Sequence, residues 1–151
     1  MSAEFFLDTN VIVYAFDAAS PDKSTIAYRL IQRALKSGAG VVSTQVVGEF
    51  LNVATRKFEA PMKAADAREF LVRVLNPLCK VYPDLEYFEN GLEIMTETGY
   101  SLYDSLVLAG AFRAGCSTLY SEDLQHGQVV RGVRIENPFV EPSERRHAKS
   151  T

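Results

Sequence analysis

Short apolar segments alternate along the chain with longer segments in which apolar residues recur every three or four positions. We predict that the short segments are strands, because nearly continuous apolar runs are typical of strands buried on both faces of a parallel sheet. The longer segments have the periodicity of amphipathic helices. This alternation predicts an α/β fold, a three-layer α/β/α sandwich with a mostly parallel central sheet. The predicted strands are residues 4–7, 40–42, 78–82, 117–120 and 133–136.

Capping and helix-breaking residues set the limits of the predicted helices. Ser20 followed by Pro21 is typical of a helix start, and Gly38 is typical of a helix end. A second helix is expected to begin at Ser43 or Thr44. Three further helices are predicted to begin at Pro61, Asp84 and Ser101, and to end at Asn76-Pro77, Gly99 and Gly115, respectively.

Two local predictions concern the segment after the first strand and the buried face of the helix after Asp84. The segment Asp8-Thr9-Asn10, after the first strand, reads as a polar turn. In the helix after Asp84, one side is apolar and the other carries glutamates, so the apolar side is expected to face the core. Its members are Leu85, Phe88, Leu92 and Met95.

The composition indicates an ordinary globular protein. The chain has 151 residues and a net charge of −3, from 19 acidic and 16 basic side chains. We expect one domain over residues 1–140 and a polar, flexible tail over 141–151. The acidity argues against nucleic-acid binding by bulk positive charge. We see no signal peptide or membrane span, and Cys79 and Cys116 lie in apolar runs as buried thiols would, so a cytoplasmic protein is expected.

Four acidic residues follow predicted strands or begin the helices beside them: Asp8, Glu49, Asp104 and Asp123. Ligands of open parallel sheets bind at the carboxyl ends of the strands, so these side chains are candidates for one site. Structural alternatives remain open: Asp8 suits an N-cap or Asx turn, and Asp104 suits a capping box with Ser101. Glu49 lies at the edge of an apolar helix face with no Lys or Arg three or four positions away.

Carboxylates that converge repel one another, and a bound cation usually offsets this repulsion. Carboxylates without histidine or cysteine suit Mg²⁺, or Mn²⁺ as a substitute, and do not suit zinc. Such ions support hydrolysis of phosphodiester bonds. The acidic residues therefore indicate metal-dependent phosphodiester chemistry, provided that they converge.

Four segments occur in an order that resembles the PIN-domain ribonucleases: Phe5-Phe-Leu-Asp-Thr-Asn10, Val46-Val-Gly-Glu-Phe-Leu51, Ser101-Leu-Tyr-Asp-Ser-Leu106 and Tyr120-Ser-Glu-Asp123. The resemblance covers essentially the whole chain. Within that family the chain looks most like the VapC-type toxins of bacterial toxin–antitoxin modules, whose endings are similar to residues 121–127 and 137–139.

The resemblance implies a Mg²⁺-dependent endoribonuclease with Asp8, Glu49, Asp104 and Asp123 as the acidic set. Asp8 and Asp104 match the principal metal ligands. Two further residues, Asn10 and Ser121, match positions that orient the turn or a metal-bound water, or that are purely structural. The family pattern also selects Asp123 in preference to its neighbour Glu122. An RNA substrate, a cognate protein antitoxin and a homodimer are the implied partners.

Other interpretations stay open at this stage. One is phosphotransfer at Asp8, although Asn10 stands where phosphatases of that type have a second Asp. Another is a non-catalytic binding module with the same fold. A catalytic role for His126 is disfavoured, because a second histidine would have to come from the tail.

Side chains outside the acidic set also have two readings. Arg29, Arg33 and Lys36 form a basic helix face that is expected to be solvated. Three aromatic residues, Tyr14, Phe16 and Phe58, suit either core packing, a homodimer face or an antitoxin-binding groove.

Overall fold

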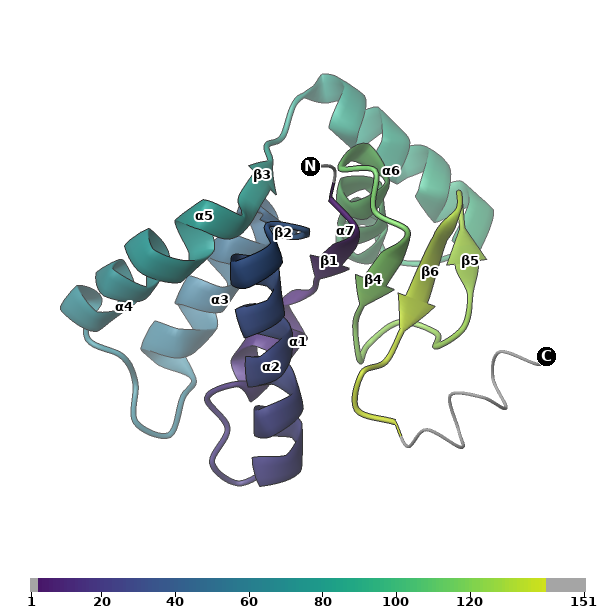
Figure 1. The fold of residues 1–151 in the computed structure, drawn as a ribbon. Helices are drawn as coiled ribbons and strands as arrows, with labels where there is room; N and C mark the ends of the chain where they lie inside the picture. The colour runs from purple at the N-terminus through teal and green to yellow at the C-terminus, as the bar shows by residue number, and fades with distance from the viewer. Residues whose placement is uncertain (1–2, 141–151) are drawn as a thin grey trace.

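The computed structural model describes residues 3–140, and the predicted tail 141–151 lies outside this range. Six strands form one sheet in the order β3-β2-β1-β4-β6-β5 (Figure 1). Pairing is parallel from β3 to β6, and only β5 runs antiparallel, against β6. The predicted α/β fold with a mostly parallel sheet is therefore confirmed. The strands are β1 (Phe5–Leu7), β2 (Gly40–Ser43), β3 (Cys79–Val81), β4 (Thr118–Tyr120), β5 (Val129–Val130) and β6 (Val133–Glu136).

Helices cover both faces of the sheet, as neighbouring residues of β1 show. Phe5 packs toward α2 (Pro21–Ser37): a Cβ placed on Gly40 would collide with both the Phe5 ring and Ala34 of this helix. Phe6 points the other way, and its ring lies 3.2 Å from the position of a Cβ on Gly110 in α7 (Leu102–Arg113). Since side chains alternate along a strand, α2 and α7 lie on opposite faces.

A short helix, α1 (Thr9–Tyr14), replaces the polar turn that was predicted after the first strand. Asp8 is its N-cap, and the backbone N–H of Thr9 donates to Asp8 Oδ1 at 2.7 Å. Val11 and Ile12 are buried. Six residues are too few for apolar periodicity to indicate a helix, so the cap and this packing decide the structure here.

The connection between β2 and β3 also differs in detail from the prediction. The helix predicted at Pro61 begins three residues later, as α4 (Ala64–Phe70), because the Met62 N–H donates to the Ala54 carbonyl and holds the chain against the end of α3 (Thr44–Arg56). The helix does not end at Asn76-Pro77. It continues through a π-helical turn, η1 (Leu71–Leu75), into α5 (Asn76–Leu78), where Pro77 occupies the first turn and needs no acceptor.

The helix α6 (Leu85–Thr98) is bounded by Asp84 and Gly99 as predicted, but its buried face is not the predicted one. Tyr87, Gly91 and Ile94 are its buried residues. Gly91 explains the rotation, because a Cβ there would lie 2.5 Å from a Leu106 methyl, so the helix makes its closest approach to α7 through a glycine. The predicted inward residues Leu85, Phe88 and Leu92 are exposed instead.

In the C-terminal part of the chain, the cap of α7 was predicted and one strand of the sheet was not. Ser101 caps the helix and accepts a hydrogen bond from the Asp104 N–H at 3.2 Å, which is one half of the predicted capping box. The strand β5 was not predicted, because two residues give no alternation to read. Cys79 and Cys116 are buried and free, as expected.

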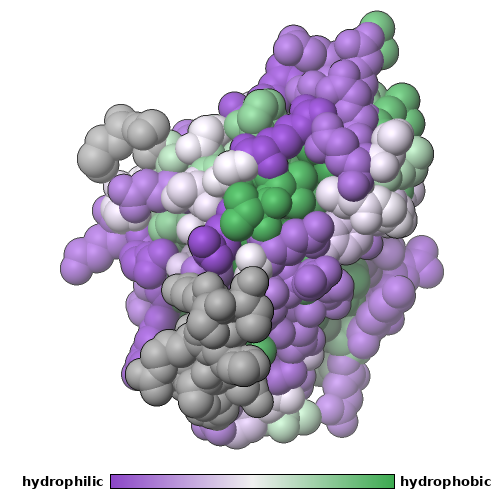
Figure 2. Space-filling model, turned by 90° about the vertical axis from the view of Figure 1, so that its right-hand side faces the viewer, coloured by the Kyte–Doolittle hydropathy of each residue, from purple (hydrophilic) through white to green (hydrophobic). Residues whose placement is uncertain are grey.

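Apolar side chains also reach the surface in several places. Figure 2 shows the side of the molecule that carries β5 and β6, where a compact hydrophobic area lies among hydrophilic residues. On α6, Leu85 is 81% exposed and Leu92 is 50% exposed. Within residues 3–140, no helix has the length and apolar content needed to cross a membrane.

Candidate active site at the carboxyl ends of β1 and β4

Two residues that follow neighbouring strands form the base of the site. Leu7 pairs with Tyr120 in the parallel ladder, so Asp8 and Ser121 come next in register and lie side by side. The Ser121 hydroxyl donates to Asp8 Oδ2 at 2.8 Å. Asp8 is 7% exposed and Ser121 is fully buried. From β1, the chain first adds strands on one side of the sheet, through β2 and β3, and then on the other side, from β4 onward. Open α/β sheets bind their ligands at such a switch point, here between β1 and β4.

The Asn10 amide connects three side chains of the site. Its Nδ2 group lies 3.3 Å from Asp8 Oδ2, 3.3 Å from Ser121 Oγ and 3.1 Å from Asp123 Oδ2, and it donates its two protons among these acceptors. Its Oδ1 atom accepts from the backbone N–H of Glu122 at 3.1 Å. Asn10 therefore holds the carboxylates of Asp8 and Asp123 toward one another.

Glu122 and Asp123 point in different directions. Glu122 accepts hydrogen bonds from the Tyr14 hydroxyl and from Lys23 Nζ, each at 2.7 Å, so its charge is used in an ion pair with α2. Asp123 is exposed at the site and is bonded to Asn10. The geometry thus favours Asp123 as the acid of the site.

Glu49 reaches the same region from α3. Its Oε2 lies 3.5 Å from the Thr9 hydroxyl, and its Oε1 accepts a 2.7 Å hydrogen bond from the Gln45 amide. Glu49 is exposed, so the apolar helix face beside it does not bury the carboxylate. Its partner in place of a Lys or Arg is a neutral amide one helical turn earlier.

Asp104 stands in the first turn of α7 and is half-buried. Its carboxylate makes no hydrogen bond or ion pair with any other residue between 3 and 140. The Tyr103 carbonyl beside it accepts from Gln45 Nε2 at 3.3 Å, which links this turn to the helix that carries Glu49. Among the described residues, no three Asp, Glu, His or Cys side chains lie close enough together to hold a metal ion in this conformation.

The electrostatics of Asp8 reflect this arrangement. Burial raises its pKa from an ordinary 3.8 to about 6. Hydrogen bonds from Ser121 and the Thr9 backbone lower the pKa in part, while the negative charges of Glu49 and Asp123 raise it. The Asp8 carboxylate thus interacts electrostatically with two of the other acids. A cation bound among these oxygen donors would offset the repulsion, and an all-oxygen donor set fits a hard divalent ion.

A pocket of about 350 Å³ opens over these residues. Thr9, Asn10, Glu49 and Asp123 line it together with Tyr14 and Glu122. Two residues that hold the lining side chains in place, Gln45 and Lys23, were not singled out as site residues from the sequence. Gln45 carries the signal of standing four residues before Glu49 on one helix face, whereas Lys23 carries none, because its contact with Glu122 spans 99 positions.

His126 has a structural environment. Its Nδ1 accepts from the Asn137 backbone N–H at 2.9 Å, and its Nε2 is buried and has no hydrogen-bond partner among the described residues. A buried Nε2 has no access to a substrate proton. The other histidine, His147, lies outside the described residues.

The fold and the acidic pocket together define an α/β protein with its ligand site at the reversal of strand order. Residues 5–131 match the PIN domain family, and the chain belongs to this family. A search of curated proteins finds no match.

The fold is similar to several solved structures, all of low sequence identity. A toxin–antitoxin complex from Klebsiella pneumoniae has 16% identity and a TM-score of 0.62, covering 91% of this chain and 98% of that one. VapBC2 of Rickettsia felis, bound to a DNA fragment from its promoter, has 20% identity and a TM-score of 0.61, with coverage of 87% and 96%. The sarcin-ricin loop cleaving toxin VapC20 of Mycobacterium tuberculosis has 19% identity and a TM-score of 0.56, with coverage of 80% and 90%.

Proposed function

We propose that this chain is a Mg²⁺-dependent endoribonuclease, with Mn²⁺ as a possible substitute, and the toxin of a toxin–antitoxin module. The observation that carries the proposal is the network in which Ser121 and Asn10 hold Asp8 beside Asp123, with Glu49 facing them from α3. The membership of the PIN domain family and the likeness to toxin structures support it.

The chemistry follows from the side chains that surround the pocket. Asp8, Glu49, Asp104 and Asp123 would hold the cation, which when bound supplies positive charge to offset that on the scissile phosphate and the leaving oxygen. Ser121 and Asn10 donate hydrogen bonds to the carboxylates of Asp8 and Asp123, and these bonds fix the orientation and spacing of the two acids. Burial of Asp8 keeps bulk water away from one side of the site.

Some of the basic side chains are already engaged and are poor candidates for holding RNA. Arg113 pairs with Asp84, and Arg131 pairs with Glu93 and Glu97. Lys23 is engaged in the same way, because it pairs with Glu122 at the rim of the acidic pocket.

The direct test is cleavage of a structured RNA by the purified protein in Mg²⁺, in Mn²⁺ and in EDTA. Cleavage is expected with either ion and is expected to stop in EDTA. Asp8→Asn should abolish it, whereas Asp66→Asn, in the exposed first turn of α4, should leave it unchanged. Cleavage that persists in EDTA, or in Asp8→Asn, contradicts the metal mechanism.

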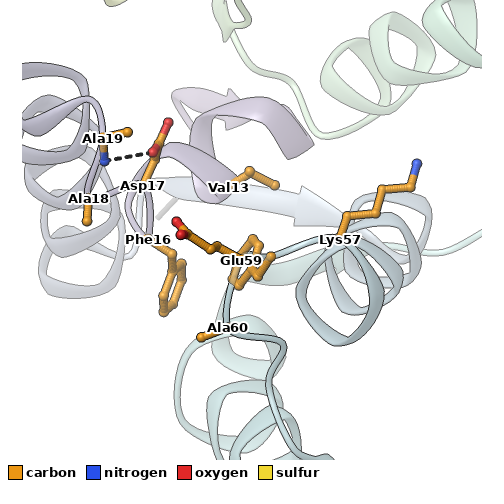
Figure 3. A pocket seen from close by; sticks show the side chains of 9 residues that line it. Val13, Phe16, Asp17, Ala18, Ala19, Lys57, Glu59 and Ala60 are labelled. Carbon is orange, nitrogen blue, oxygen red and sulfur yellow. Dashed lines mark hydrogen bonds between the residues drawn. The ribbon is translucent and has the colours of Figure 1, made fainter.

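The antitoxin partner has a candidate binding place beside the active-site pocket. A second pocket, of about 530 Å³, lies between the segment after α1, with Phe16 and Ala18, and the segment after α3, with Phe58 and Ala60 (Figure 3). Val13 lines both pockets, so a segment seated in the second would also limit access to the first. We propose that an apolar segment of the antitoxin binds there.

Ala60→Arg tests this binding place, because it fills the pocket from an exposed position without disturbing the core. The variant is expected to lose co-purification with the cognate antitoxin and to keep nuclease activity. Ala65→Arg, an exposed change on α4, serves as the control. Retained binding by Ala60→Arg contradicts the location.

A homodimer is also proposed, on the exposed apolar side chains of α6. Leu85, Phe88 and Leu92 form a stripe on one side of this helix, and each is more than two-fifths exposed. Apolar stripes of this kind are typical of protein interfaces. Light scattering should give twice the mass of the chain for the wild type, and the monomer mass for Leu85→Lys. A wild-type monomer contradicts the proposal.

A further inference from the structure

The Gln45 side chain makes contacts with residues of three helices. Its Nε2 group donates to Glu49 Oε1 at 2.7 Å, within α3, and to the Tyr103 carbonyl at 3.3 Å, at the start of α7. Its Oε1 atom lies 3.3 Å from the hydroxyl of Tyr87, a residue of α6. One amide thus connects the helix that carries Glu49 with the turn that carries Asp104.

The chemistry of its neighbours fixes the orientation of this amide. A carboxylate and a backbone carbonyl only accept hydrogen bonds, so the NH₂ group must face Glu49 and Tyr103. The carbonyl oxygen then faces Tyr87, whose hydroxyl has one proton to share between Gln45 Oε1 and the Leu106 carbonyl at 3.0 Å. A flipped amide would place its oxygen against two acceptors.

Tyr87 gives the amide a rigid support. It is 3% exposed, and its ring lies in the contact between α6 and α7. Burial, together with the nearby charge of Glu49, raises the pKa of the Tyr87 hydroxyl to about 12, so this group remains a donor at physiological pH. The support is therefore constant over the pH range in which the carboxylates ionise.

Apart from Gln45, the rest of the protein gives the Glu49 side chain little support. Its side chain is exposed, and apart from Gln45 its contact is the Thr9 hydroxyl at 3.5 Å, the outer limit of a hydrogen bond. A glutamate on a helix surface otherwise samples several rotamers, and ordering it on cation binding costs free energy. A lysine or arginine in place of Gln45 would fix Glu49 too, but its charge would compete with a cation for the carboxylate.

We propose that Gln45 is a positioning residue of the acidic site, which holds the Glu49 carboxylate beside the first turn of α7 in an orientation that favours the binding of a divalent cation. This inference rests on the proposed function. Gln45 acts through Glu49 and touches neither the RNA nor the cation. Because it is neutral, it positions the carboxylate without weakening its attraction for the ion.

Binding of Mn²⁺, measured by electron paramagnetic resonance in the absence of RNA, tests the proposal separately from catalysis. Gln45→Met has a side chain of similar length without the amide, and it is expected to weaken Mn²⁺ binding about tenfold, the effect typical of losing a residue that orients a metal ligand. Tyr87→Phe, which keeps the buried ring, is expected to weaken it less. Gln32→Met, on the exposed face of α2, removes an amide that donates to Tyr28 and should leave the affinity unchanged.

A double-mutant cycle with Glu49→Gln distinguishes positioning from a general structural effect. If Gln45 acts through Glu49, Gln45→Met should have little further effect once Glu49 is Gln. Equal weakening in both backgrounds overturns the proposal, and so does wild-type affinity of Gln45→Met. A wild-type protein that binds no Mn²⁺ is a different result, because it overturns the proposed nuclease function itself.

Discussion

The Ser121 hydroxyl donates a 2.8 Å hydrogen bond to the Asp8 carboxylate across 113 positions of the chain. This contact stabilises the ionised form of Asp8 and partly offsets the effect of burial, which raises the pKa of Asp8 to a net value of about 6. The two residues follow adjacent parallel strands, so their separation depends on the backbone of the sheet. The pKa of Asp8 therefore depends on the register between β1 and β4.

Ser121→Ala should shift the pH dependence of metal binding upward. Without the hydroxyl the pKa of Asp8 rises further, and protons then compete with a divalent cation at higher pH. We expect the midpoint of Mn²⁺ affinity against pH to move up by about one unit, with little change above pH 8. Ser117→Ala, an exposed serine before β4, is the matched control. A uniform loss at all pH values would show that Ser121 acts on something other than the ionisation of Asp8.

Asp8→Asn should raise the stability of the metal-free protein at neutral pH. The folded-state pKa of Asp8 lies above its ordinary value, so the folded state holds the proton more tightly, and the free energy of unfolding falls as pH rises from about 4 to about 6. A shift of this size corresponds to about 3 kcal/mol, less what the variant loses in hydrogen bonds.

Urea unfolding in EDTA at several pH values measures this effect. The decline between pH 4 and 6 should be smaller in Asp8→Asn than in the wild type, and the variant should be the more stable of the two at pH 7.5. Mg²⁺ should reverse that order by stabilising the wild type alone. Parallel pH profiles for the two proteins contradict the prediction.

The position of the candidate site was predictable from the sequence because it depends on chain order and strand ends. Asp8 and Asp123 follow predicted strands, and the structure brings them to one amide, that of Asn10. The supporting contacts were less accessible. Gln45 reaches the Tyr103 carbonyl only because the fold brings the start of α3 close to the start of α7, and no spacing along the chain predicts this contact.

The errors in the fold come from residues that hydropathy does not weigh. On α6 the pattern placed Leu85 and Leu92 inward, while the helix packs through Gly91. Close approach of two helix backbones contributes more contact than the exposed leucines on the other side. Hydropathy also failed to predict α1. The helix begins with a single capping hydrogen bond to Asp8, and the polar residues at this position are equally typical of a turn.

Arg113→Gln should destabilise the fold at neutral pH and lose this effect in acid. The Arg113 guanidinium and the Tyr87 backbone N–H hold the pKa of Asp84 down at about 2. A depressed folded-state pKa stabilises the fold above the ordinary value of 3.8, and this stabilisation disappears as pH falls toward 2.

Unfolding of the wild type and Arg113→Gln should therefore differ at pH 7 and converge between pH 4 and 2. Arg29→Gln, on the exposed face of α2, removes a charge without an ion pair among the described residues and controls for net charge. A difference that persists unchanged to pH 2 would mean that Arg113 stabilises by packing.

Gly91→Ala and Gly48→Ala should have opposite effects on stability, although both place a methyl group in the middle of a helix. At Gly91 the new Cβ would lie 2.5 Å from a methyl of Leu106, which is itself 2% exposed and has little room to move. Overpacking of this kind costs about 1–3 kcal/mol. At Gly48, in α3, no atom outside the helix lies within 4 Å, so the better helix propensity of alanine should stabilise by about 1 kcal/mol. Thermal and urea unfolding of both variants measure the two signs, and stabilisation by Gly91→Ala would show that α6 is not packed against α7 through this glycine.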